Sequence, residues 1–278
     1  MMNNKIGVQI VYSKTTDLTA KCCEAMEMGI PTCQICMWDD SMYTEEYAEA
    51  VKEALTVSGI QLTSIWAGWR GPCEWNFQYG PSTIGLVPPA YRDSRVSALK
   101  AASDFAWMVG VDRIVTHVGF IPENPDDPNF TGTVAALRSI LKYMKPRNQY
   151  FLFETGQETP VTMLRTIQAL GYENVGINFD TANLILYGKA NTLDALDVFG
   201  QYVMETHIKD GVYPVDGFAL GKECPAGQGK ANLPAVVKRL GELGYTGAFT
   251  IEREISGERQ KQDILMAKAL LTEWMKDA

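Results

Sequence analysis

The sequence predicts a single (β/α)8 barrel. Short apolar runs, each typical of a strand buried on both faces, alternate with longer helical runs along the 278 residues. Many of the helical runs stop at a glycine, and the next strand-like run begins within a few residues. Eight such strand–helix units in about 250 residues match the size of this barrel.

The first four units are expected at strands 5–11, 32–37, 61–66 and 113–117, with helices at 15–28, 44–58, 90–109 and 131–144. The last four are expected at strands 150–154, 175–180, 202–207 and 247–252, with helices at 160–170, 192–199, 233–243 and 259–275. Thr159 is the predicted N-cap of the fifth helix, because Pro160 suits the first helical position. The glycines that end helices are Gly29, Gly59, Gly110, Gly171 and Gly244.

A doubly wound open sheet is the alternative fold, but such a sheet seldom uses eight units and does not need polar ligands on so many strands. No linker, low-complexity tract or block of charge marks a second domain. We therefore expect one domain over residues 1–278.

The composition limits which binding partners and which cellular compartment we expect for this protein. The net charge of −8 argues against nucleic acid and anionic membranes, which attract basic surfaces. No run approaches the roughly 20 apolar residues of a membrane span, and the chain starts directly in a strand without a secretory signal. Cys33 and Cys36 form a C-x-x-C, but in a strand these positions point to opposite faces. We expect free thiols and a cytoplasmic protein.

Four of the strand-like runs end in residues that bind metals: Glu154, Asp180, His207 and Glu252. Taken singly, each has an ordinary explanation, such as a helix cap, an Asx-turn or a core histidine. Ionised side chains, however, are rarely buried unless they pair or hold a cation. The carboxyl ends of neighbouring barrel strands meet at one mouth, so these four side chains are expected to converge. The sequence therefore predicts one divalent metal site.

Four strand ends also resemble a known family: Glu154-Thr155-Gly156, Asp180-Thr181-Ala182-Asn183, His207-Ile208-Lys209-Asp210 and Ile251-Glu252. They are similar to the sugar isomerase/epimerase branch of the xylose-isomerase-like TIM barrels. That branch includes D-tagatose and D-psicose 3-epimerases and inosose-processing enzymes, and the wider superfamily includes endonuclease IV. The resemblance is strongest over residues 116–255. It implies that two Glu, one Asp and one His hold a divalent ion, often manganese, and that Glu154 and Glu252 double as acid/base groups.

The chain departs from the 3-epimerases at two substrate-binding positions. Asn183 stands where those enzymes carry a histidine, and Lys209 stands where they use an arginine. Lys209 is expected either to orient a substrate hydroxyl or carboxylate, or to pair with Asp210. We therefore keep a keto-glycoside, an inosose and a sugar acid as alternative substrates to a simple ketose.

Further candidates lie near the predicted mouth. His117 resembles a metal ligand of endonuclease IV, but the chain has two histidines in all, too few for that three-metal site. We predict that His117 binds substrate. Trp66 and neighbouring tryptophans are expected either to stack against a sugar or to serve dimer contact or loop packing. Glu254 shares a face with Glu252 and is expected either to support the site or to pair with Arg253 or Lys209.

For two other features, the sequence favours a structural role over a functional one. The Gly227-Gln228-Gly229 segment either binds phosphate through backbone N–H groups or forms a turn, and the turn is favoured. Glu158 is expected at a helix start, where a negative charge is favourable without a catalytic role.

Together these features predict a divalent-metal-dependent isomerase or epimerase of a keto sugar, acting by proton transfer beside the carbonyl through a metal-stabilised enediolate. Manganese is the expected ion, with cobalt, magnesium and zinc as alternatives. The principal rival is a lyase on the same site, either a dehydratase of an inosose or an enzyme that cleaves a keto-glycoside. A non-catalytic sugar-binding barrel and a nuclease are weaker rivals. The resemblance also implies a homo-oligomer, either a dimer or a tetramer.

Overall fold

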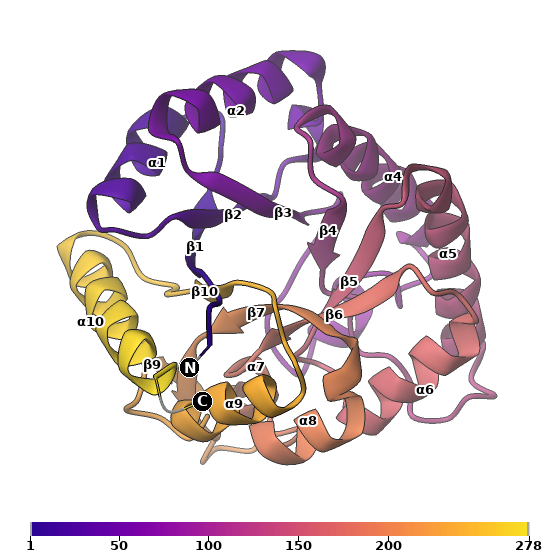
Figure 1. Ribbon diagram of the computed structural model, residues 1–278. Helices are drawn as coiled ribbons and strands as arrows, with labels where there is room; N and C mark the ends of the chain where they lie inside the picture. The colour runs from indigo at the N-terminus through magenta and orange to yellow at the C-terminus, as the bar shows by residue number, and fades with distance from the viewer. Residues whose placement is uncertain (1, 277) are drawn as a thin grey trace.

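The computed structural model describes residues 2–276 and 278 and shows a closed barrel of parallel strands (Figure 1). The order around the barrel is β1-β10-β7-β6-β5-β4-β3-β2. Helices surround the barrel, and the two chain ends lie close together (Figure 1). The predicted single (β/α)8 barrel is confirmed.

The barrel strands are β1 (Ile6–Val11), β2 (Thr32–Met37), β3 (Gln61–Ala67), β4 (Arg113–Thr116), β5 (Tyr150–Glu154), β6 (Val175–Asp180), β7 (Val203–Ile208) and β10 (Phe249–Ile251). The main helices are α1 (Leu18–Glu27), α2 (Glu45–Ser58), α4 (Arg92–Met108), α5 (Pro128–Met144), α6 (Pro160–Leu170), α8 (Thr192–Phe199), α9 (Leu233–Glu242) and α10 (Glu258–Trp274). Shorter elements that the sequence did not predict are η1 (Asp40–Met42), α3 (Gly80–Thr83), η2 (Lys145–Arg147), α7 (Asn183–Leu186), η3 (Gly200–Tyr202), β8 (Asp210–Val212) and β9 (Lys222–Cys224).

Capping residues explain where several helices begin. Helix α5 starts three residues earlier than predicted, because the Asp127 carboxylate accepts the backbone N–H of Asn129 at 2.7 Å and Pro128 occupies the first turn. Helix α1 starts three residues later than predicted, since Asp17 is its N-cap. Thr159 caps α6 as predicted. The five glycines expected at helix ends all have positive φ.

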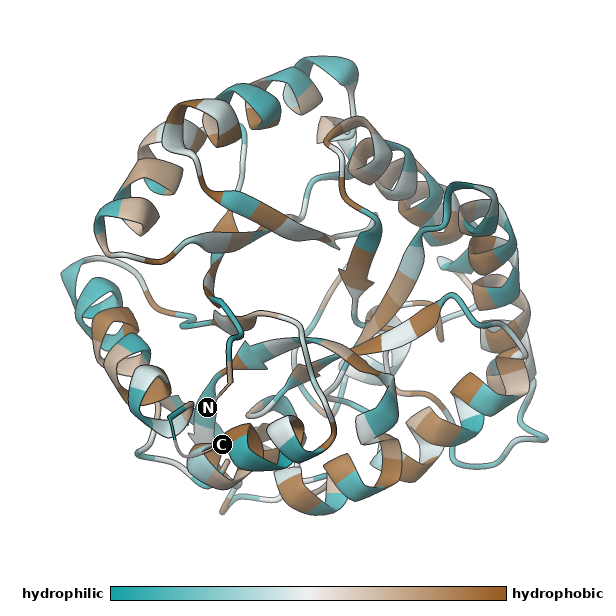
Figure 2. Ribbon diagram, in the orientation of Figure 1, coloured by the Kyte–Doolittle hydropathy of each residue, from teal (hydrophilic) through white to brown (hydrophobic). Residues whose placement is uncertain are grey.

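The core has two parts, one between the barrel and the helices and one inside the barrel. Large side chains such as Phe151 and Phe153 fill the first part, where their rings lie 5.4 Å apart. Inside the barrel, Trp66, Val115 and Leu152 lie side by side in register. Figure 2 shows this hydrophobic character along the barrel strands and a mixture of hydrophobic and hydrophilic residues along the helices. Glu154 lies two residues beyond Leu152 on the same face, so the apolar layer supports the site from below.

The segment after β7 forms an antiparallel hairpin, β8–β9, where the sequence predicted only a long loop. The carboxylate of Asp210 accepts the backbone N–H groups of Gly227 and Gly229, both at 2.9 Å, and of Ala231 at 3.0 Å. A Cβ at Gly229 would lie 2.1 Å from the Asp210 carboxylate, so only glycine fits there. These N–H groups therefore bind an internal carboxylate, and the favoured interpretation of this segment as a turn is confirmed. Among the described residues, no helix has the length and apolar character needed to cross a membrane.

Candidate metal centre

The four predicted ligands come together at the carboxyl ends of neighbouring strands. Each of Glu154, Asp180, His207 and Glu252 offers one ligand atom, and these atoms lie within 4.8 Å of one another. From His207 Nδ1, the carboxylate oxygens are 3.0 Å away for Glu154, 3.4 Å for Glu252 and 3.7 Å for Asp180. All four side chains are buried.

The strand register brings these side chains together. Glu154 ends β5 and Asp180 ends β6, while Asp180 is aligned with His207 on β7. At two of these four ligand-bearing strand ends the sequence prediction was off by one residue, since β7 continues to Ile208 and Glu252 follows β10. The Glu252 backbone N–H still bonds to the Ile208 carbonyl at 3.3 Å, which holds it at the barrel rim.

Threonines next to the ligands join the strand ends. Thr155 Oγ1 donates to the Asp180 carbonyl at 2.9 Å and accepts the Asp180 N–H at 2.9 Å. Thr181 Oγ1 bonds to the carbonyls of His207 at 3.2 Å and Lys209 at 2.5 Å. The motifs Glu154-Thr155 and Asp180-Thr181 therefore supply both a ligand and the hydrogen bonds that fix the backbone of the next strand.

Asp180 has one oxygen held by backbone and one free to bind. Its Oδ1 accepts the N–H groups of Ala182 at 2.8 Å and Asn183 at 2.7 Å. Its Oδ2 is buried without a hydrogen-bond partner and lies 3.7 Å from both His207 Nδ1 and Lys209 Nζ. Burial raises the pKa of Asp180 to about 7. An unpartnered buried carboxylate oxygen in such a cluster fits a cation ligand.

Gln34 orients the histidine, and the sequence analysis missed it. Gln34 Nε2 donates to Ser64 Oγ at 3.0 Å, so its Oε1 is left to accept, and it lies 2.7 Å from His207 Nε2. This contact places a hydrogen on Nε2 and leaves Nδ1, which faces the carboxylates, as the ligand position. Burial alone would lower the pKa of His207, but the carboxylates of Glu252 and Glu154 raise it well above its ordinary value.

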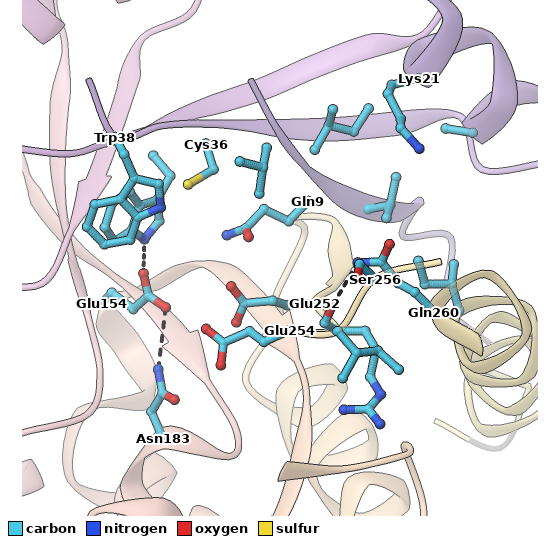
Figure 3. A pocket seen from close by; sticks show the side chains of 18 of the residues that line it. Gln9, Lys21, Cys36, Trp38, Glu154, Asn183, Glu252, Glu254, Ser256 and Gln260 are labelled. Carbon is cyan, nitrogen blue, oxygen red and sulfur yellow. Dashed lines mark hydrogen bonds between the residues drawn. The ribbon is translucent and has the colours of Figure 1, made fainter. Parts of the chain in front are cut away.

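Three neighbours hold Glu154 at the cavity wall. Trp66 Nε1 donates to Glu154 Oε2. Asn183 Nδ2 donates to Glu154 Oε1 at 3.5 Å (Figure 3). His117 Nε2 lies 3.6 Å from the same Oε1, while its Nδ1 has no partner. Burial lowers the pKa of His117, which favours the neutral imidazole. Trp66, Asn183 and His117 all line the cavity, where we predicted substrate contacts.

Lys209 lies behind Glu252, the second predicted acid/base residue. Its ammonium is 3.0 Å from the carboxylates of both Glu252 and Glu254, and it contacts the side-chain oxygen of Asn183 at 3.4 Å. The expected alternative of a pair with Asp210 is not formed, because Asp210 points into the glycine loop. Burial opposes ionisation of Glu252, but Lys209 and His207 outweigh it and hold the pKa of Glu252 well below its ordinary value.

Glu254 reaches solvent from the cavity wall. Its side chain is 60% exposed and pairs with Lys209, one of the two partners the sequence suggested. Arg253 instead bonds to Glu223 and Asp263, both at 2.9 Å.

A cavity of about 720 Å³ opens above the cluster. Trp38 and Trp75, which are 40% and 39% exposed, line it together with Trp66. The rings of Trp38 and Trp66 are 4.4 Å apart, and Trp75 lies 5.1 Å from the His117 ring. Exposed indole faces next to acid and amide groups suit a sugar ring. Trp75 comes from the loop after β3, so only the fold places it beside His117.

Glu158 lies at the start of α6 as predicted, but its burial opposes the negative charge that the sequence analysis expected there. Helix α6 begins at Pro160, and Glu158 lies before its cap, 2% exposed, with both oxygens lacking a hydrogen-bond partner. Burial raises the pKa of Glu158 to about 8. The side chain is therefore kept as a neutral acid near pH 7.

Comparison with known proteins agrees with this geometry. The model of the family described as xylose isomerase-like TIM barrel matches residues 22–274. The chain belongs to the xylose isomerase-like TIM barrel family. The resemblance inferred from its strand ends is thereby confirmed at the level of the family.

Individual relatives of this xylose isomerase-like chain differ in their similarity. The xylose isomerase domain protein from Planctomyces limnophilus is 35% identical, with a TM-score of 0.90 over 98% of this chain and 97% of that one. The 3-keto-D-glucoside 4-epimerase YcjR from E. coli is 18% identical and shares the fold, with a TM-score of 0.70 over 98% and 100% of the two chains. The uncharacterized protein MJ1311 of Methanocaldococcus jannaschii is 23% identical over 195 residues, which are 66% of this chain and 63% of that protein.

Proposed function

We propose that the protein is a divalent-metal-dependent isomerase or epimerase that moves a proton next to the carbonyl of a keto sugar. The observation that carries this proposal is the buried cluster of Glu154, Asp180, His207 and Glu252 below a cavity lined with tryptophans. Membership of the xylose isomerase-like family and the structural similarity to a sugar epimerase support it.

The donor set fits a divalent ion. Three carboxylates and one imidazole suit manganese, which we expect, and also cobalt, magnesium or zinc. The free oxygen of Asp180 and Nδ1 of His207 both face the centre of the cluster. When bound, the ion would polarise the sugar carbonyl and stabilise the negative charge that develops on it.

Glu154 and Glu252 carry the proton in this proposal. Lys209 keeps Glu252 ionised, which suits a base, and Trp66 with Asn183 orients the carboxylate of Glu154. The two carboxylates come from different strands, β5 and the end of β10. One removes the proton from the sugar carbon and the other returns it on the opposite face, which inverts that carbon.

The test is incubation of the manganese-loaded protein with a panel of keto sugars in D2O, followed by NMR and mass spectrometry. We expect exchange of one carbon-bound proton with retention of the sugar skeleton. Glu154→Gln and Glu252→Gln should each lower the exchange rate by about 10²–10⁴-fold. Glu205→Gln is the matched control, because Glu205, two residues before His207 on β7, is also buried but pairs with Arg113 and is not one of the four clustered ligands.

Two results would contradict the proposal. Loss of a leaving group from the sugar would establish the lyase alternative on the same site. A protein that exchanges no sugar proton, with the control and both variants equally silent, would support the non-catalytic sugar-binding barrel.

A further inference from the structure

The part of the cavity next to the metal centre presents mainly hydrogen-bond acceptors. Glu154, Glu252 and Glu254 all line the cavity. Figure 3 shows the carboxylates of Glu252 and Glu254 extending toward Glu154. An ionised carboxylate accepts hydrogen bonds and donates none. A ligand group that lies among these side chains must therefore donate hydrogens, as a sugar hydroxyl does and as a carboxylate does not.

The positive charges that line the cavity are engaged by carboxylates. Among the described residues that line it, the cationic side chains are Lys21 and Arg253. Lys21 is 3.2 Å from Glu24, and Figure 3 shows it away from Glu154. Arg253 bonds to its two carboxylate partners at 2.9 Å each. Neither side chain offers an unpaired charge to an anion bound over the metal centre.

Lys209 brings another positive charge to this region, but acceptors cover it. Its side chain is 1% exposed, and its ammonium lies 3.0 Å from the carboxylates of both Glu252 and Glu254. The side-chain oxygen of Asn183 lies 3.4 Å from the same ammonium. These contacts match the donor capacity of an ammonium group. Lys209 therefore has no hydrogen left for a ligand while Glu254 is in place.

Glu254 is held in position and still reaches the cavity. Its backbone N–H bonds to both carboxylate oxygens of Glu223, at 3.2 and 3.3 Å, and its own carboxylate pairs with Lys209. Glu223 is held in turn by Arg253 at 2.9 Å. The Glu254 side chain is nevertheless 60% exposed. It therefore presents a fixed negative charge to whatever occupies the cavity.

The charge of Glu254 is in excess at this site. The three carboxylates of the candidate metal centre balance a bound divalent ion together with the Lys209 ammonium. Glu254 adds one further negative charge beside them. Like charges a few ångströms apart at a partly buried site repel strongly.

We propose that Glu254 selects the substrate by charge: it accepts hydrogens from sugar hydroxyls, and it closes Lys209 to carboxylate and phosphate groups. This inference rests on the proposed function and assigns a specificity-determining residue to the same site. Of the substrate alternatives that the sequence left open, it disfavours the sugar acid. It also separates the role of Lys209 from direct contact with the substrate.

The experiment compares a neutral sugar with its acid. The neutral compound is the keto sugar that exchanges fastest in the D2O panel. The acid is the keto-uronic acid in which a carboxylate replaces its terminal CH2OH group. Exchange by the manganese-loaded protein is followed by NMR. We expect kcat/KM for the neutral sugar to exceed that for the acid by at least about tenfold.

Two variants link this preference to Glu254. Glu254→Gln keeps the volume and removes the charge, so it should lower the neutral-to-acid ratio of kcat/KM by at least about tenfold. Glu254→Ala should lower the ratio further, because it also uncovers Lys209. Glu53→Gln is the control, since Glu53 is exposed on α2 and does not line the cavity, and it should leave the ratio unchanged.

A binding measurement provides a readout that does not need turnover. The same proteins are titrated with both compounds while tryptophan fluorescence is followed, because Trp38, Trp66 and Trp75 line the cavity. The acid-to-neutral ratio of dissociation constants should fall in the same order, from the native protein to Glu254→Gln to Glu254→Ala. If a variant loses exchange with both compounds, this ratio applies the same criterion.

The failures are distinguishable. A native ratio near one, or a ratio that stays unchanged in both Glu254 variants, would overturn the role of Glu254 and leave the proposed function standing. No exchange by the native protein with any keto sugar would overturn the proposed function. The dissociation constants would then test Glu254 alone, and an unchanged ratio would overturn its role as well.

Discussion

Replacing Gln34 with leucine tests how the candidate metal centre is built. Gln34 is fully buried, and its Oε1 lies 2.7 Å from His207 Nε2. Leucine keeps a similar volume but cannot accept the hydrogen of Nε2. The histidine would then be free to carry its hydrogen on Nδ1, the atom that faces Glu154, Asp180 and Glu252.

The size of the effect follows from the burial of this contact. A buried N–H without an acceptor costs about 1–3 kcal/mol. Loss of the partner that orients a metal-binding histidine typically lowers metal affinity about 10–100-fold, which corresponds to about 1.4–2.7 kcal/mol. The two ranges agree, so we expect the dissociation constant for Mn²⁺ to rise by at least about tenfold.

The assay is calorimetric titration of Mn²⁺ into the native protein and the Gln34→Leu variant at one fixed pH. Gln149→Leu is the matched control. Gln149 is also fully buried and bonds through both amide atoms, to Ser103 Oγ at 2.7 Å and the Ser103 carbonyl at 2.8 Å. It directly precedes β5, at the opposite end of that strand from Glu154. It should lose stability by a similar amount and keep the native Mn²⁺ affinity.

One result would refute the reasoning. If Gln34→Leu is folded and binds Mn²⁺ as tightly as the native protein, then Gln34 does not set the hydrogen position of His207, or His207 is not a ligand. A loss of affinity in Gln149→Leu equal to that in Gln34→Leu would show that general destabilisation, rather than histidine orientation, explains the change.

Two further predictions concern stability. Asp210 accepts hydrogen bonds from three loop N–H groups. Asp210→Asn should therefore lower the free energy of unfolding in urea by about 2 kcal/mol or more. The control variant Asp216→Asn, on the exposed hairpin, should change that free energy by less than about 0.5 kcal/mol. The pKa of Glu158 is about 8 in the folded protein against an ordinary 4.5, so the native state holds a proton that the unfolded chain releases. This contribution is complete below pH 4.5 and is lost as the pH rises through about 8, by up to about 1.4 kcal/mol per pH unit. Unfolding measurements from about pH 5 to about pH 9 should show that decline in the native protein and a smaller one in Glu158→Gln; parallel curves for the two proteins would contradict it.

The sequence by itself determined the barrel and the ligand types. Strand and helix periodicity are local properties, and Gly59 or Gly171 ends a helix through its own backbone freedom. The position of a carboxylate at a strand end is also local. Because parallel barrel strands all end at one mouth, Glu154 and Asp180 could be placed near each other from their positions in the chain.

Only the tertiary structure decided how those groups are supported. Gln34 and His207 are 173 residues apart in sequence, and nothing local to either residue predicts their contact. The partners of Lys209 and the burial of Glu158 likewise depend on side chains from other elements. The sequence pattern determines which face of each helix or strand is apolar. The closure of the barrel determines which side chains, distant in sequence, come into contact.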